Sequence, residues 1–153
     1  MSKMKLAEAL IERKSLKGQI DQVVSRMKEN TLIEEGGTPD EDIAELEKTY
    51  ESLALRFLDL ANRINNTNNH AMLDNKMTIA KAIIERDYLK SKITSYRAVK
   101  DSASNSARRG WQTTKYIRLI DMASYQKMID DLSRQFRELD TKIQGQNWNT
   151  ELL

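Results

Sequence analysis

The sequence predicts an all-α protein, an antiparallel four-helix bundle made from a tandem repeat of one long helical hairpin. Three observations predict this fold class. Of 153 residues, 31% are charged and 6% aromatic, with one proline and five glycines, which is typical of long helices with solvated faces. The apolar residues recur at alternating spacings of three and four, as on one face of a helix. The chain also contains two copies of one pattern.

The internal repeat is defined by two alignments. Residues 4–23 match residues 77–96 at a shift of 73, and residues 47–68 match residues 126–147 at a shift of 79, so the second copy is 79 − 73 = 6 residues longer. The identical residues are Met4, Ala7, Ala9, Ile11, Glu12, Arg13, Leu16, Lys17 and Ile20, then Lys48, Leu53, Phe57, Leu60, Ile64 and Asn68. Copied units of this kind cover each other's apolar faces. We expect a single helical-bundle domain over residues 1–153, with repeats at 4–70 and 77–149.

In the first copy, apolar stripes predict helices over residues 6–27 and 46–64. The stripes are Leu6, Ala9, Arg13, Leu16, Ile20, Val23 and Met27, then Leu46, Tyr50, Leu53, Phe57, Leu60 and Ile64. Between them, Gly36-Gly37 predicts a turn. The following Thr38-Pro39-Asp40-Glu41 fits a helix start, with an N-cap, a proline at the first helical position and a capping-box glutamate.

In the second copy, the corresponding stripes predict helices over residues 79–96 and 125–143. They are Ile79, Ala82, Arg86, Leu89, Ile93 and Tyr96, then Tyr125, Ile129, Leu132, Phe136, Leu139 and Ile143. Asp121 is the expected N-cap of the last helix, because a carboxylate accepts hydrogen bonds from the first free N–H groups. Four stripes of this kind make a coiled-coil-like bundle.

Apolar residues beside the stripes predict a homo-oligomer, a dimer or higher, with the dimer as the simplest closed form. They are Leu10, Ile11, Leu55, Leu58, Ile83 and Ile84. These residues widen the apolar face beyond what a two-helix seam needs, so a partner subunit could cover them. Helices of roughly 25 residues, about 37 Å long, are also long for a monomer of this size.

The most unusual stripe positions are Arg13 and Arg86, which occupy the same place in both copies and follow Glu12 and Glu85. The favoured interpretation of this polar core pair is structural, a salt-bridge network that fixes helix register. The functional alternative is a charged cluster that binds an anion or, through the glutamates, a metal. A di-metal bundle would also need Glu-x-x-His pairs, and the only histidine, His70, is expected in a loop.

The sequence predicts no catalytic residue, cofactor or metal site. It has no cysteine, which excludes disulfides and thiolate chemistry, and Gly36-Gly37 lacks the Lys-Ser/Thr of a phosphate-binding loop. The Asn-rich residues 62–70 and their counterpart 144–150 are expected to cap helices, with a ligand site as the alternative. With no long apolar leader and no run of about 18 apolar residues, we expect a cytoplasmic protein without a membrane span.

The longer loop of the second copy is the strongest candidate for binding. Residues 97–118 carry six basic side chains against one acid, Asp101, with two aromatic residues among them. The candidate binding residues are Arg97, Lys100, Arg108, Arg109, Trp111, Lys115, Tyr116 and Arg118. This mixture suits phosphate contacts and base stacking, so nucleic-acid or anion binding is one hypothesis. An oligomer contact or a solvated loop is the alternative, and a short strand or β-hairpin is possible within residues 103–120.

Three segments also carry a resemblance to a known family: Met4–Lys14, Arg63–Asn68, and Glu138–Gln144 with the ending Asn147–Leu153. In these segments the chain resembles a family of small uncharacterised bacterial proteins often labelled septicolysin. The label implies a lytic, membrane-active protein, but the polar helix faces mix both signs of charge and are not rich in Lys and Arg alone. We therefore expect a non-enzymatic, self-associating interaction or structural protein. Nucleic-acid or anion binding through residues 97–118, and lysis, are the alternatives.

Overall fold

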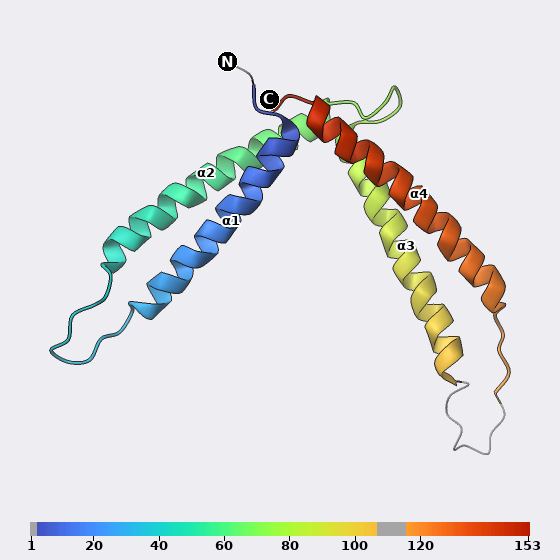
Figure 1. The fold of residues 1–153 in the computed structure, drawn as a ribbon, viewed down its shortest axis with the longest axis horizontal. Coiled ribbons are helices and arrows are strands. Elements are labelled where there is room, and N and C mark those ends of the chain that lie inside the picture. Colours follow the sequence, from blue (N-terminus) through green and yellow to red (C-terminus); the bar gives the residue numbers. More distant parts are fainter. Residues whose placement is uncertain (1–2, 107–115) are drawn as a thin grey trace. The chain divides into compact units, whose positions relative to one another are not determined.

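The computed structural model describes residues 3–106 and 116–153. Within them it contains α1 (Leu6–Glu29), α2 (Ile43–His70), α3 (Ile79–Ser106) and α4 (Met122–Asn149). The all-α class is confirmed: α1 and α2 form one antiparallel hairpin, and α3 and α4 form the other (Figure 1). The chain divides into two compact units, Met1–Ala71 with Gln146–Leu153, and Met72–Gly145. No helix among the described residues has the length and apolar character needed to cross a membrane.

The predicted apolar stripes form the cores of the two hairpins. Every stripe residue is buried or half-buried. In the second hairpin, Ile93, Ile129 and Leu132 make a buried cluster, and partly buried side chains pack around it. One of these is Tyr96, whose ring meets that of Tyr125 edge-on at 5.8 Å between centroids. Alternating spacings of three and four therefore identified the buried face of each helix correctly.

The residues beside the stripes divide into two groups. Leu10 and Ile83 are half-buried, but Ile11, Leu55, Leu58 and Ile84 are exposed. Ile11 and Ile84 are equivalent in the two copies, at 61% and 70% exposure, whereas Leu55 and Leu58 correspond to Arg134 and Arg137 in the second copy. Of these six flanking residues, Leu10 and Ile83 therefore extend the buried face beyond the stripe, and the other four lie at the surface.

The linker between α1 and α2, residues 30–42, contains the predicted glycine turn in its middle. Gly37 donates its N–H to the Glu34 carbonyl at 2.8 Å, and Gly36 has φ +84°. This combination defines a type II turn, whose third residue must adopt positive φ and so favours glycine. An alanine at position 36 would be strained in this conformation.

The predicted start of the second helix is wrong. The N-cap of α2 is Asp42, which accepts a hydrogen bond from the Ala44 N–H at 2.9 Å, and not Thr38. The residue expected to close a capping box, Glu41, binds Arg26 at the end of α1 and donates its backbone N–H to the Asn30 side-chain oxygen at 3.0 Å. The Arg26 guanidinium holds the pKa of Glu41 below its usual value. These contacts keep Glu41 at the end of α1, so the helix starts after it.

The predicted cap of the last helix is confirmed. Asp121 accepts hydrogen bonds from the Ser124 hydroxyl and from the Ala123 and Ser124 N–H groups. These bonds, that of the Ser124 hydroxyl above all, lower the pKa of Asp121. The possible strand within residues 103–120 is not found in the described part of this range. Residues 103–106 belong to α3 and residues 116–119 have no regular structure, while 107–115 lie outside the described residues.

Two short antiparallel bridges repeat the internal symmetry. Lys5 pairs with Glu151, and Met72 pairs with Thr78. The two pairs are equivalent under the shifts of 73 and 79, because Lys5 corresponds to Thr78 and Met72 to Glu151. The main-chain bonds match as well: Leu152 N–H to Met4 O corresponds to Leu73 N–H to Met77 O, both at 2.9 Å. The duplication therefore extends beyond the helices into the segments that follow α2 and α4.

Thr67, near the end of α2, joins one of these segments to the first hairpin. Its side chain is wholly buried. The hydroxyl donates to the Arg63 carbonyl at 2.8 Å and accepts the Leu153 N–H at 3.0 Å. Nearby, His70 is the last residue of α2 and not a loop residue as expected, with its Nδ1 2.8 Å from the Asn66 carbonyl. The Asn-rich segment therefore ends α2 and also supports residues 150–153.

Candidate functional site

The polar core pair consists of a glutamate and an arginine at equivalent positions of α1 and α3. Glu12, Arg13, Glu85 and Arg86 are all half-buried. In the first hairpin, Glu12 on α1 accepts from the Arg56 guanidinium on α2 at 3.5 Å. This ion pair lies within the first hairpin and joins its two helices.

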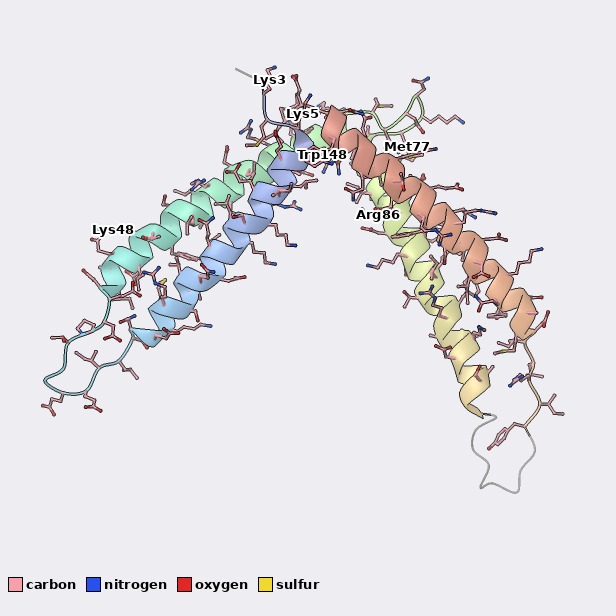
Figure 2. All side chains as sticks on the ribbon, viewed as in Figure 1. Lys3, Lys5, Lys48, Met77, Arg86 and Trp148 are labelled. Atoms are coloured by element: carbon pink, nitrogen blue, oxygen red, sulfur yellow. The ribbon has the colours of Figure 1, made fainter. Side chains whose placement is uncertain are left out.

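In the second hairpin, Arg86, labelled on α3 in Figure 2, donates to Asp140 on α4 at 3.2 Å. Arg86 also binds its neighbour Asp87 at 2.9 Å. The partners are not repeated, because the residue equivalent to Asp140 in the first copy is Ala61. Across residues 3–106 and 116–153, no group of three or more His, Asp or Glu residues could hold a metal ion. The Glu12–Arg56 and Arg86–Asp140 ion pairs each join the two helices of one hairpin, which suits a structural role.

The candidate binding loop is only partly described. Arg97 is exposed on α3, Lys100 donates to the Gln126 side chain, and Arg118 donates through Nε to the Ala103 carbonyl at 3.4 Å. Such a bond satisfies a carbonyl near the C-terminal end of α3, where positive charge is favourable. Arg108, Arg109, Trp111 and Lys115 lie outside the described residues.

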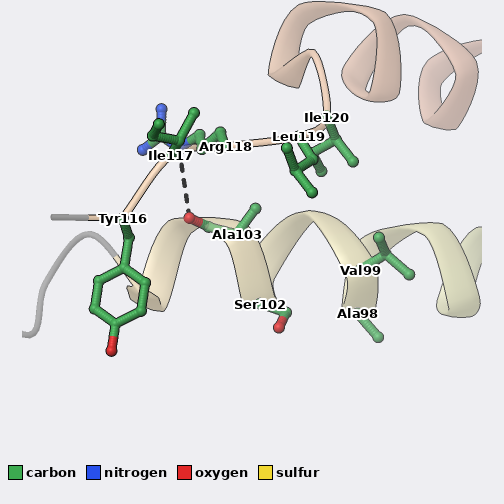
Figure 3. Close-up of a pocket in the computed structure, with 9 residues that line it drawn as sticks. All are labelled: Ala98, Val99, Ser102, Ala103, Tyr116, Ile117, Arg118, Leu119 and Ile120. Carbon is green, nitrogen blue, oxygen red and sulfur yellow. Dashed lines mark hydrogen bonds between the residues drawn. The ribbon is translucent and has the colours of Figure 1, made fainter. Parts of the chain in front are cut away.

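The structure adds an apolar groove to this basic region. Residues 116–120 run in the opposite direction to α3, over its last turns, and bound a groove of about 870 Å³ with them (Figure 3). We call this surface the second tip. It is lined by Ala98, Val99, Ser102, Ala103, Tyr116, Ile117, Arg118, Leu119 and Ile120. Only one of these nine residues, Arg118, carries a charge, so the groove suits apolar groups better than a chain of phosphates.

The aliphatic residues of the second tip are exceptionally exposed. Leu119 is 96% and Ile117 85% exposed, and Val99 on α3 is 46% exposed. Side chains of this kind gain free energy when a partner removes them from water. From the sequence we selected the basic residues of this loop and missed these aliphatic ones. The signal was present as Tyr-Ile-Arg-Leu-Ile at residues 116–120, where large apolar residues flank an arginine without any helical periodicity.

The end of the first hairpin has a similar apolar character and the opposite charge. A groove of about 490 Å³ is lined by Asn30, Thr31, Leu32, Ile33, Pro39, Asp40, Glu41, Asp42 and Ile43. We call residues 30–43 the first tip. Leu32 is 88% and Ile33 54% exposed. Residues 30–43 contain five acids (Glu34, Glu35, Asp40, Glu41, Asp42) and no base. Among the described residues, the three most exposed large hydrophobic side chains, Leu119, Leu32 and Ile117, all lie in the two tips.

The described residues define an all-α protein of two helical hairpins, with exposed aliphatic side chains at the hairpin ends and an ion pair between the helices of each hairpin. The chain belongs to a family of unknown function, DUF6847, whose model matches residues 3–152. It is also similar to a protein of known crystal structure, a functionally unknown conserved protein from Corynebacterium diphtheriae. The two are 33% identical over 99% of this chain and 100% of that chain, with a TM-score of 0.95. No curated protein matches the chain.

Proposed function

We propose that the protein is a non-enzymatic interaction protein that self-associates through its second tip. The observation that carries this proposal is the exposure of Ile117 and Leu119, at 85% and 96%, beside an apolar groove. Burying a large aliphatic side chain contributes about 1.5–3 kcal/mol. Two such residues contribute enough to offset part of the translational and rotational entropy that association costs.

The polar core pair has a supporting role in this proposal. Glu12 and Arg86 each join the two helices of one hairpin. We propose that they, together with Arg13 and Glu85, fix the register of each hairpin and take no part in binding. Registered helices hold the second tip in shape, because residues 116–120 rest on α3 and lead into α4.

Replacing Ile117 and Leu119 together by serine is expected to abolish self-association. Serine removes the apolar area and leaves the charge of the tip unchanged. Wild-type protein should have a light-scattering mass above the 17.7 kDa of one chain, and the double variant a mass equal to it. The matched control is Ile11→Gln with Ile84→Gln, which removes two exposed isoleucines from helix faces and should keep the wild-type mass. If the control dissociates and the tip variant does not, association runs through the helix faces instead.

Nucleic-acid binding is the second candidate function, favoured by the six basic residues within residues 97–118. The apolar lining of the groove argues against it, so we expect labelled oligonucleotides to show no saturable binding at low salt. Fluorescence anisotropy measures this directly. Binding that weakens on Arg108→Ala with Arg109→Ala, but not on Arg134→Ala with Arg137→Ala on α4, would contradict our expectation. A true phosphate contact would also lower the salt slope by about 1 for each arginine removed.

The septicolysin label of the resembling family implies membrane lysis, which is the third candidate. No feature of the described surface favours it over self-association. Release of a trapped dye from anionic liposomes would support the label, and we expect none. The cytoplasmic location and the single domain over residues 1–153 stay predictions.

A further inference from the structure

We propose that the second tip of one copy binds the first tip of another copy, so that the chains assemble head to tail. This inference rests on the proposed function, because it names what the second tip binds. It commits to a second copy of this chain as the partner, and to the surface formed by residues 30–43 as the contact.

The first tip has the chemistry that the second tip requires. Leu32 and Ile33 are consecutive in the sequence, and 88% and 54% of their surface is exposed. These side chains can therefore enter the apolar groove of about 870 Å³ at the second tip. Glu34 and Glu35 follow directly in the type II turn, and Asp40 lines the same end of the hairpin. A pair of aliphatic side chains is thus flanked by exposed carboxylates.

The second tip offers the complementary charges. Arg118 belongs to the groove, and Arg97 lies one residue before its first lining residue, Ala98. Among the described residues of 97–118, three bases (Arg97, Lys100 and Arg118) exceed one acid (Asp101) by 3 − 1 = 2, while residues 30–43 carry five acids and no base. Opposite charges around two apolar patches select the correct partner and accelerate its approach.

Contact between two second tips is disfavoured by the same charges. It would bring two surfaces of net positive charge together, and contact between two first tips would do the same for carboxylates. Juxtaposed like charges lower the affinity for the wrong partner. The favoured contact is therefore heterologous, between different surfaces. Every chain carries one surface of each kind, so the contact generates a ring or an open chain of copies.

Two blocked variants test the assembly. In one, Leu32→Ser with Ile33→Ser removes the apolar part of the first tip. In the other, Ile117→Ser with Leu119→Ser removes that of the second tip. All four residues are exposed, and circular dichroism with thermal unfolding verifies that both variants keep the wild-type fold. Each variant alone is expected to associate about a hundredfold or more weakly than wild type, because it loses two large apolar contacts.

Mixing the two variants gives the decisive result. Each still has one intact tip of the complementary kind, so a 1:1 mixture is expected to form a dimer of one copy of each, and nothing larger. If the variant blocked at the first tip still self-associates like wild type, the second tip binds something other than the first tip, and the head-to-tail inference is overturned while the proposed function survives. If the variant blocked at the second tip also self-associates, both are overturned.

Discussion

Leu16→Ala is expected to lower the free energy of unfolding by about 2–5 kcal/mol, the largest single-residue effect that we predict. Leu16 lies in the middle of α1, in the apolar stripe that faces α2, and only 1% of it is exposed. Truncation to alanine loses the transfer free energy of the removed methyl and methylene groups. It also leaves a cavity between two helices that can close only in part. Urea unfolding followed by circular dichroism measures the loss.

Ile11→Ala is the matched control for Leu16→Ala. Ile11 lies on the same helix, but 61% of it is exposed. Its truncation should change the free energy of unfolding by no more than about 0.5 kcal/mol, as is usual at surface positions. Equal losses in the two variants would show that Leu16 is not a core residue, and would contradict the inward orientation of the stripe.

Thr67→Val is expected to lower the free energy of unfolding by about 1–3 kcal/mol, although valine has nearly the same shape as threonine. The hydroxyl of Thr67 is the acceptor for the Leu153 N–H and is wholly buried. Valine would leave that donor without its partner and would weaken the attachment of residues 150–153 to the first hairpin. Amide hydrogen exchange should show lost protection at Leu153, together with a lower unfolding midpoint.

Thr67→Ser separates the hydrogen bond from the packing. Serine keeps the hydroxyl and removes only a methyl group, so the Leu153 amide should stay protected. If serine and valine expose that amide equally, the hydrogen bond is not what holds residues 150–153, and burial of Leu152, only 5% exposed, would be the remaining cause.

The helices and their buried faces could be predicted from the sequence because they depend on local spacing. The stripe positions from Leu6 to Met27 and from Tyr125 to Ile143 are all buried or half-buried, as expected. The copy-to-copy identities supported this independently. The cap at Asp121 was predictable for the same reason, since its hydrogen bonds reach only residues 123 and 124.

Features that depend on contacts between distant residues were not predictable in this way. Thr38 was expected to start the second helix, but Arg26 binds Glu41 and shifts the start to Asp42. In the sequence, Thr67 is one more polar residue of an Asn-rich segment. Its role could not be predicted, because its partner Leu153 is 86 residues away. The shared Leu73 and Leu152, identical at the shift of 79, would have revealed that the repeat continues past α2 and α4.

The charge pattern of the sequence indicated a candidate binding loop, and the structure added an apolar groove beside it. The excess of basic residues in 97–118 drew attention to the loop of the second copy. The groove beside it, however, combines Val99 on α3 with Leu119 on the returning segment, and that pairing depends on how the loop turns back. The acidic first tip was not predicted, because only two of its five carboxylates, Asp40 and Glu41, were interpreted, and these as part of a helix start.

We propose above all that the protein self-associates through two tips that combine exposed apolar side chains with opposite charges. Sedimentation velocity of the wild-type chain over a wide concentration series, at low and at high salt, tests it most directly. We predict a mass that rises above 17.7 kDa with concentration and falls back as salt screens the opposite charges of the tips. A single 17.7 kDa species at every concentration and both salts would contradict the claim.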